Sequence, residues 1–289
     1  MTGVQTCALP ISLPTSTPWQ VATPTATQIP FSAQNDRTNP LTGLKVFEPN
    51  LLFERPIMVK LANWPQSLRP FNQIIDADIV FEYYIGYQMN HLLALYYGGD
   101  AAAVGPLAPG RLVDARLARR YQASLVVTSA PPTVEGVFEQ TLPDRVFYRG
   151  YAPCPGICTE TESQGGNTVV NTAAMRTFIE SEGISTALER LPDFYFDKKI
   201  ENWDENALRL SYLYADFSVM DWRYDKTFGG YQLWQDFQQA DGSYTLQQTF
   251  DRDSGQQVIF ENVLILLADY IEYRSESTRL NSSHGKLSR

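Results

Sequence analysis

The chain has 289 residues, which is enough for one large domain or two ordinary ones. Hydrophobic residues make up 44% of it, with many Tyr, Phe and Trp, so it can bury a sizeable core and favours β-structure. The formal net charge of -9 and the lack of a basic stripe exclude nucleic acid as an expected partner, because a phosphate backbone requires clustered Lys and Arg.

The two ends of the sequence are unlike ordinary protein termini. Residues 2–11 read TGVQTCALPI and residues 277–284 read STRLNSSH, and both resemble translated sequencing adapter. We therefore expect an adapter-derived scar at each end, which forms no part of the fold. On this interpretation Cys7 and His284 have no functional part, a signal peptide is missing, and the C-terminal region is truncated at its end.

Residues 13–38 are rich in Thr, Pro and Ala and contain little that could be buried. Such a composition cannot offset its ordering entropy, so we expect an extended, disordered tether. An ordinary interdomain linker is the alternative. We favour a tether behind a lost N-terminal membrane anchor, which predicts an extracytoplasmic protein on the outer face of the cytoplasmic membrane. No stretch of the sequence reaches the ~18 apolar residues that a membrane-spanning helix needs.

Apolar, β-branched and aromatic runs alternate with helical patterns in the first part of the chain. Strands are predicted at residues 55–62, 77–86, 89–99 and 124–130. Helices are predicted at residues 112–123, 131–142 and 171–183. The strand runs are continuous rather than alternating, which indicates strands covered on both faces. Because only Tyr87 and Gln88 separate the second and third runs, we expect a tight hairpin there.

After Trp203 the pattern changes to strands in quick succession. They are predicted at residues 208–214, 219–225, 229–237, 244–251 and 262–273. Alternation of apolar and polar residues favours an antiparallel sheet. We therefore predict an α/β N-terminal domain with a mixed sheet flanked by helices, followed by a β-rich, antiparallel C-terminal domain. The expected boundaries are 1–12 for the first scar, 13–38 for the tether, 39–200 and 201–273 for the two domains, and 274–289 for the second scar.

Several short motifs follow one another along the chain. They are NPLTGL at 39–44, RPIMVKLAN at 55–63, ADIVFE at 77–82, LLALYY at 92–97, GPL with Arg111 at 105–111, SLVVTSA at 124–130, SYLY at 211–214, WRYD at 222–225, GGY at 229–231 and DSGQQVIFENVLILLAD at 253–269. In order and spacing they resemble the YerB-like bacterial lipoprotein family, a domain of unknown function with a separate C-terminal domain. The resemblance implies an α/β N-terminal domain, a β-rich C-terminal domain and attachment outside the cytoplasmic membrane, but no known reaction.

Some positions depart from that family's pattern. After ADIVFE the family carries an acidic residue and then a Thr-Arg pair, where this chain has Gly86, Asn90 and His91. The family's loop after the Gly-Pro pair usually has two arginines, where this chain has Ala108 and Arg111. The resemblance therefore implies no intact anion-binding or phosphoryl-transfer site, because only Arg111 is retained.

Asp78, Glu82 and His91 lie around the predicted hairpin and are candidate ligand-binding residues. Paired carboxylates can do acid–base work or bind a cation, and Glu82 is placed to reach His91 across the hairpin. A histidine base also needs a nucleophile, and none is evident in the sequence nearby. The alternative is that the acids belong to a turn and the surface, and that His91 is a packing residue.

Arg111 ends the Gly/Pro-rich loop GPLAPGR immediately before a predicted helix. Backbone N–H groups and the helix dipole favour an anion at such a position. The loop lacks the Lys-Ser/Thr pair of a P-loop, and its prolines remove donors. Arg111 is therefore the foremost candidate for ligand binding, with a helix-capping role as the alternative.

Cys154 and Cys158 flank a Pro-Gly turn that can bring their sulfur atoms together. An oxidising compartment would let them form a disulfide, and free thiols in a tight turn are the alternative. Two cysteines and one distant histidine cannot supply the four ligands of a zinc site, so we expect no metal.

Two further patterns favour an ordinary structural interpretation. DRDSG at 251–255 resembles the start of a calcium loop but lacks most of the later ligands, so a hairpin turn is predicted. Trp222, Tyr224, Tyr231 and Trp234 form either a glycan-stacking platform or core and cross-strand pairs, and their strand spacing favours the second.

We expect no catalytic residue and no cofactor. The sequence is interpreted as an envelope protein that binds a cell-wall component or another envelope protein. The alternative is a cell-envelope enzyme that acts on a phosphorylated or glycosidic substrate. Its site would be formed by Asp78, Glu82, His91 and Arg111.

Overall fold

The structure is a computed structural model that describes residues 37–160, 167–188, 191, 194, 196, 208–215 and 217–266. The adapter-like ends lie outside these residues, and so does the Thr/Pro-rich segment up to residue 36. The expected boundary between residues 200 and 201 also lies outside them.

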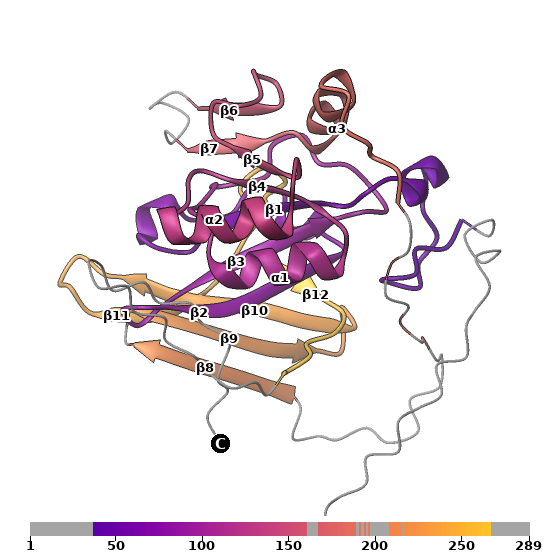
Figure 1. Ribbon diagram of the computed structural model, residues 1–289. Helices are drawn as coiled ribbons and strands as arrows, with labels where there is room; N and C mark the ends of the chain where they lie inside the picture. Colours follow the sequence, from indigo (N-terminus) through magenta and orange to yellow (C-terminus); the bar gives the residue numbers. More distant parts are fainter. Residues whose placement is uncertain are drawn as a thin grey trace, which may run out of the picture.

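The first part of the chain forms a mixed sheet, as predicted, and the sheet has five strands (Figure 1). Its order is β2-β3-β1-β4-β5, with antiparallel pairing among β2, β3 and β1 and parallel pairing among β1, β4 and β5. The strands are β1 Ile57–Ala62, β2 Ile79–Gly86, β3 Met89–Tyr96, β4 Ser124–Val127 and β5 Val146–Tyr148. All six residues of β1 are buried, because the strand is covered on both faces.

Three helices pack around this sheet. They are α1 Leu112–Arg120, α2 Pro132–Thr141 and α3 Thr172–Ser181. The side-chain oxygen of Asn171 accepts a hydrogen bond from the Ala174 N–H at 2.9 Å, so Asn171 is the N-cap of α3. Shorter elements are the 3₁₀ turns η2 Pro49–Phe53, η3 Gln66–Leu68 and η4 Ile74–Asp76, and the paired strands β6 Ile157–Thr159 and β7 Thr168–Val170. No helix among the described residues is long and apolar enough to cross a membrane.

The second part of the chain forms an antiparallel sheet, as predicted, and its strand order is β11-β10-β9-β8. Its strands are β8 Arg209–Ala215, β9 Ser218–Asp225, β10 Gly230–Gln238 and β11 Tyr244–Gln248, and β12 Ile259–Phe260 pairs with β10. The strand predicted at 262–273 is wrong for residues 262–266, which form no strand and expose Leu264, Ile265 and Leu266. The rest of that segment lies outside the described residues.

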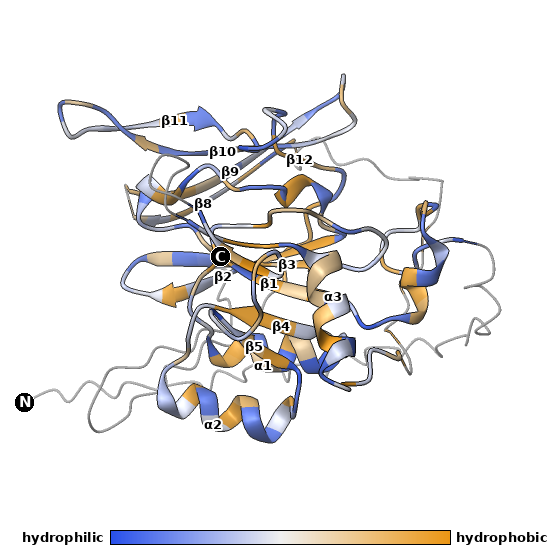
Figure 2. Cartoon of the chain, turned by 90° about the horizontal axis from the view of Figure 1, so that it is seen from above, coloured by the Kyte–Doolittle hydropathy of each residue, from blue (hydrophilic) through white to orange (hydrophobic). Residues whose placement is uncertain are grey.

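The N-terminal sheet is the middle layer of the molecule (Figure 2). One of its faces packs against the C-terminal sheet, in a core that includes Leu61, Leu92 and Met220. Its other face packs against α1 and α2, in a core that includes Leu93 and Phe138. Because successive side chains of a strand point to opposite faces, each polar residue of β2 and β3 belongs to only one of these two interfaces.

Candidate functional site

Asp78 anchors the chain around the start of β2. Its carboxylate accepts hydrogen bonds from the N–H groups of Tyr97 and Gly98 at 2.6 and 2.9 Å, and from Asn39 Nδ2 at 2.6 Å. Burial raises the pKa of this carboxyl group, and the hydrogen bonds oppose that shift. All its partners belong to the turn after β3 and to the start of the fold, so its geometry indicates a structural role.

Glu82 and His91 lie on opposite faces of the N-terminal sheet. In the register of β2 and β3, Glu82 is opposite Leu92, and Tyr83 is opposite His91. Glu82 Oε1 accepts hydrogen bonds from Asn90 Nδ2 and from the Tyr214 hydroxyl, both at 2.9 Å. The expectation that Glu82 reaches His91 across the hairpin is therefore wrong, because the strand pleat separates them.

The loop before α1 runs between the carboxyl ends of the parallel strands β1 and β4. The Ala108 N–H donates to the carbonyl oxygen of Lys60, and the Thr128 N–H donates to the carbonyl oxygen of Ala108, both at 2.9 Å. His91 of β3 lies near the same edge, because it is paired with Ala62, the last residue of β1. In open α/β sheets, ligands bind in the crevice outside the carboxyl ends of the strands. The topology therefore brings Arg111 and His91 to one edge.

A buried cluster of Lys60, Tyr83 and Asp114 supports this edge. Lys60 Nζ lies 3.4 Å from Asp114 Oδ1, and neither side chain is exposed to solvent. Lys60 also donates to the Tyr83 hydroxyl, which in turn donates to Asp114. Burial lowers the pKa of Lys60 to about 8, although the Asp114 carboxylate acts in the opposite direction. The sequence contained a signal for this cluster, since a lysine within the apolar run IMVKLA requires a partner.

Arg111 is the N-cap of α1 and is partly buried. Its backbone N–H donates to Asp114 Oδ2 at 2.6 Å, and its guanidinium donates to the Gly110 carbonyl at 3.2 Å. Among the described residues, the guanidinium forms no ion pair with a carboxylate. Burial lowers the pKa of Arg111, but an arginine remains charged at neutral pH. In the first helical turn the Asp114 N–H donates to the Arg111 carbonyl oxygen at 3.0 Å, which leaves the N–H groups of Leu112 and Val113 as donors for an anion.

His91 completes the edge with an unpaired ring nitrogen. Its side chain is 5% exposed, and its Nδ1 atom has no hydrogen-bond partner. Burial lowers the pKa of His91 well below 6.5, and the positive charges of Lys60 and Arg111 lower it further, so the ring is neutral at pH 7. Lys60 pairs with the carboxylate of the cluster, Asp114, whereas the Arg111 guanidinium forms no ion pair with a described carboxylate, so one positive charge is uncompensated within the cluster.

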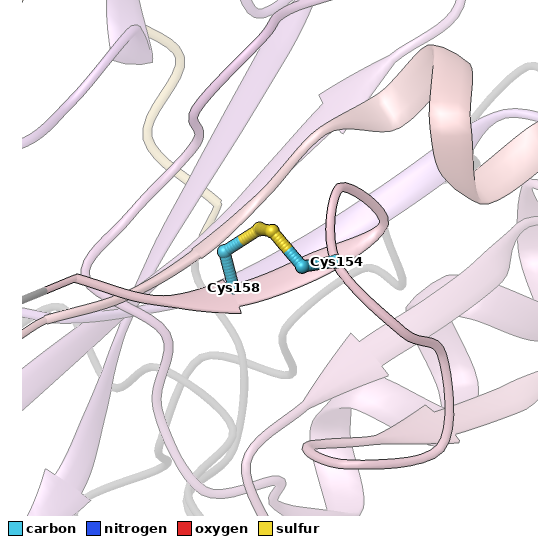
Figure 3. The surroundings of a disulfide bond; sticks show 2 residues. All are labelled: Cys154 and Cys158. Atoms are coloured by element: carbon cyan, nitrogen blue, oxygen red, sulfur yellow. A yellow bond between two sulfur atoms is a disulfide. The ribbon is translucent and has the colours of Figure 1, made fainter.

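The two cysteines and the acidic turn are structural features. Cys154 and Cys158 form a disulfide with 4.9 Å between their Cα atoms (Figure 3). Asp251 accepts hydrogen bonds from the N–H groups of Asp253 and Ser254, both at 3.1 Å, which closes a turn. Among the described residues, no group of His, Cys, Asp or Glu side chains could hold a metal ion.

The four aromatic residues of the possible glycan-stacking platform do not all share one face. Trp222 packs edge-on against Phe260, and Tyr224 packs edge-on against Tyr231, on the side of the C-terminal sheet that contains the core. Trp234 is opposite Asp221 in the register, and therefore lies on the other face. Trp222, Tyr224 and Tyr231 therefore form core and cross-strand pairs, and Trp234 stacks instead with the Arg223 guanidinium, 3.9 Å from the ring centroid.

Comparison with known proteins agrees with this architecture. A family model described as the N-terminal domain of a protein of unknown function (DUF3048) matches residues 41–185. The crystal structure of the YerB protein from Bacillus subtilis is similar, with a TM-score of 0.63 and 20% sequence identity, over 84% of this chain and 79% of that one. At this identity the likeness shows the fold alone. No curated protein matches the sequence.

Proposed function

Because the chain belongs to the DUF3048 family of proteins of unknown function, we propose its function from its own side chains. The protein is an extracytoplasmic, membrane-anchored envelope protein that binds an anionic group of a cell-wall component or of another envelope protein. The anion binds at the first turn of α1, where Arg111 supplies the charge.

The uncompensated guanidinium of Arg111 carries this proposal. A partly buried cation normally has a carboxylate partner, because burial removes the water that would otherwise solvate the charge. The only carboxylate of the cluster, Asp114, is already bound by Lys60, Tyr83 and the backbone N–H of Arg111. An anionic ligand would supply the missing charge, and the free N–H groups of the helix start would add hydrogen bonds.

The same geometry favours binding over catalysis. The enzyme alternative requires Glu82 and His91 to act on one substrate, and the register places them on opposite faces of the sheet. A general base must come within hydrogen-bonding reach of the group that it deprotonates. His91 is also held neutral and buried beside two cations, which suits a residue that shapes a site more than one that accepts a proton.

Two features support a position outside the cytoplasm. The Cys154–Cys158 disulfide suits an oxidising compartment, since thiols in the cytosol are kept reduced. Residues 13–38 have the composition of a flexible tether, which would hold the folded part away from a membrane surface. The resemblance to the YerB-like lipoproteins agrees with both.

The anion site can be tested by calorimetric titration with inorganic phosphate and with glycerol 3-phosphate. We expect Arg111→Ala to weaken binding by about 10- to 100-fold, which is the contribution of one hydrogen-bonded charge. Arg111→Lys should have an intermediate effect, because it keeps the charge and loses the planar fork. Arg119→Ala is the matched control, since Arg119 lies exposed on the same helix. Equal affinities of the Arg111→Ala and Arg119→Ala variants would contradict the proposal.

The location can be tested independently in cells that produce the native protein. A membrane-impermeant maleimide should label Cys154 and Cys158 in intact cells only after treatment with a reductant. Labelling without reductant, or labelling that requires cell lysis, would contradict an oxidised pair outside the cytoplasm.

A further inference from the structure

The balance of charges at the start of α1 indicates which kind of anion the site takes. Lys60 Nζ and Asp114 Oδ1 lie 3.4 Å apart with neither side chain exposed, so these two charges compensate each other. The partly buried Arg111 guanidinium forms no ion pair with a described carboxylate. His91 adds no charge, because burial and the positive charges of Lys60 and Arg111 lower its pKa and keep the ring neutral at pH 7. One net positive charge remains for a ligand.

A single positive charge matches a singly charged anion. A dianion would leave one negative charge without a partner beside Arg111, where burial has removed much of the water, and such a charge is costly. A phosphate monoester loses its second proton with a pKa of about 6, so it is mostly a dianion at pH 7.5. A phosphodiester has no second proton to lose and carries one negative charge. The charge balance therefore favours a phosphodiester over a phosphate monoester.

The hydrogen-bond donors at this edge favour a phosphate group over a carboxylate. Arg111 presents a planar fork, and the start of α1 adds the N–H groups of Leu112 and Val113. A carboxylate has about four acceptor positions, and they lie in one plane. The two unesterified oxygens of a phosphodiester belong to a tetrahedral group and can accept from several directions, which suits donors from a side chain and a helix start together.

His91 adds a neutral donor on the same face of the sheet. It is paired with Tyr83, whose hydroxyl donates to Asp114 of α1, so both side chains point toward the α1 layer. The His91 side chain is 5% exposed, and its Nδ1 atom has no hydrogen-bond partner among the described residues. A buried polar atom without a partner is uncommon in folded proteins and calls for one, such as a ligand. A neutral imidazole has one N–H group, which Nδ1 can carry.

We propose that the site at the start of α1 selects a singly charged phosphodiester, with Arg111 as its cation and His91 Nδ1 as the neutral donor to one unesterified oxygen. The N–H groups of Leu112 and Val113 bind the other unesterified oxygen. This inference rests on the proposed function and deepens it, because it names the chemical class of the anion. Both a wall component and a phospholipid headgroup can carry a phosphodiester.

The choice of anion is tested by calorimetric titration of the full chain at pH 7.5 with glycerophosphoglycerol, a diester, and with glycerol 3-phosphate, a monoester. We expect the diester to bind about tenfold more tightly, since it leaves no charge unpaired. Failure of both esters to bind would contradict the proposed function itself. Tighter binding of glycerol 3-phosphate, weakened by Arg111→Ala, would leave the anion site intact and overturn the choice of a diester. Tighter binding of acetate than of glycerophosphoglycerol would overturn it in favour of a carboxylate.

The part of His91 is tested with two variants that differ in the donor. His91→Phe keeps a ring of similar size and removes the N–H group, so it should bind glycerophosphoglycerol about tenfold more weakly. His91→Asn places an amide N–H near the position of Nδ1 and should bind within about threefold of the unmodified chain. A purely structural ring would give the opposite order, because phenylalanine fills the space better than asparagine. Equal affinity of His91→Phe and the unmodified chain would overturn this part of the proposal.

The source of the diester is tested by sedimentation with phosphatidylglycerol vesicles, whose headgroup is the same glycerophosphoglycerol. Vesicle binding that Arg111→Ala abolishes would support the diester and assign it to a lipid. Binding of the soluble diester without binding to vesicles would support it and assign it to a wall component. Vesicle binding that is unchanged in Arg111→Ala, together with no binding of the soluble diester, would overturn the proposal.

Discussion

Lys60 and Asp114 form an ion pair at the carboxyl edge of β1, with 3.4 Å between Nζ and Oδ1 and with neither side chain exposed. Such a pair is weak evidence for stability, because the loss of water around both charges offsets their attraction. Removal of one partner is different, since it leaves the other charge buried without compensation. The two residues should therefore tolerate joint replacement better than single replacement.

Replacement of Lys60 by Met should lower the free energy of unfolding by about 3–5 kcal/mol. Methionine fills a similar volume, so the loss arises from Asp114, whose remaining donors are Tyr83 and the Arg111 N–H. Urea denaturation followed by circular dichroism would measure the effect. Lys226→Met serves as the surface control and should change stability by less than about 0.5 kcal/mol.

The double variant Lys60→Met, Asp114→Leu should recover most of that loss. Both charges are then gone, and apolar side chains of similar size fill the space. Should the double variant be less stable than Lys60→Met alone, the buried-pair explanation would be wrong, and Asp114 would instead stabilise the start of α1 on its own.

Stability should also depend on pH through Lys60. Burial lowers its pKa in the folded state from 10.5 to about 8. Between these two values the unfolded chain binds more protons than the folded chain, so this group makes the free energy of unfolding rise with pH. The stability difference between the unmodified chain and Lys60→Met should grow by about 1–2 kcal/mol between about pH 8 and pH 9.5. A constant difference across this range would show that Lys60 titrates normally.

Helices and strands could be predicted from the sequence where a long run of residues showed the periodic or apolar pattern of that element. The apolar run of β1 and the Asn171 cap of α3 are local signals, and both are found in the structure. The strands β5, β6, β7 and β12 were missed, because two or three residues are too few to show a period. The segment 262–266 is strongly apolar, yet it forms no strand, since strand formation depends on a partner and not on composition alone.

The candidate site could be predicted only in part. Arg111 was found because a helix start after a Gly/Pro-rich loop is a local pattern. The separation of Glu82 from His91 follows from strand alternation and could have been derived from the register of a tight hairpin. The Lys60–Asp114 pair could not be predicted from the sequence, because 54 residues separate its members and only the packing of α1 on the sheet brings them together.

Gly110 should be intolerant of a side chain, because the loop before α1 passes close to α2. A Cβ atom at Gly110 would lie 2.8 Å from Cε2 and 2.9 Å from Cζ of Phe138. Gly110→Ala should therefore lower the free energy of unfolding by about 1–3 kcal/mol through overpacking. It should also displace the neighbouring Arg111 and weaken phosphate binding. Gly136→Ala is the matched control in α2, where no atom beyond the adjacent residues and the backbone of the same helix lies within 4 Å of the new methyl group. It should stabilise the protein by about 0.5–1 kcal/mol and leave phosphate binding unchanged. Equal stability of the two variants would refute the close contact.

The Cys154–Cys158 disulfide should contribute a modest part of the stability. It joins residues that are four apart in sequence. Closing so short a loop restricts the unfolded chain little, and the chain-entropy relation gives about 2 kcal/mol. The double variant Cys154→Ser, Cys158→Ser should therefore fold and should unfold at a lower urea concentration, by an amount equal to the effect of dithiothreitol on the unmodified chain. Cys7 is the one cysteine left in the double variant and has no second cysteine in the chain to pair with. Dithiothreitol should therefore not change the stability of the double variant. If reduction does not change the free energy of unfolding of the unmodified chain, the disulfide does not stabilise the folded state.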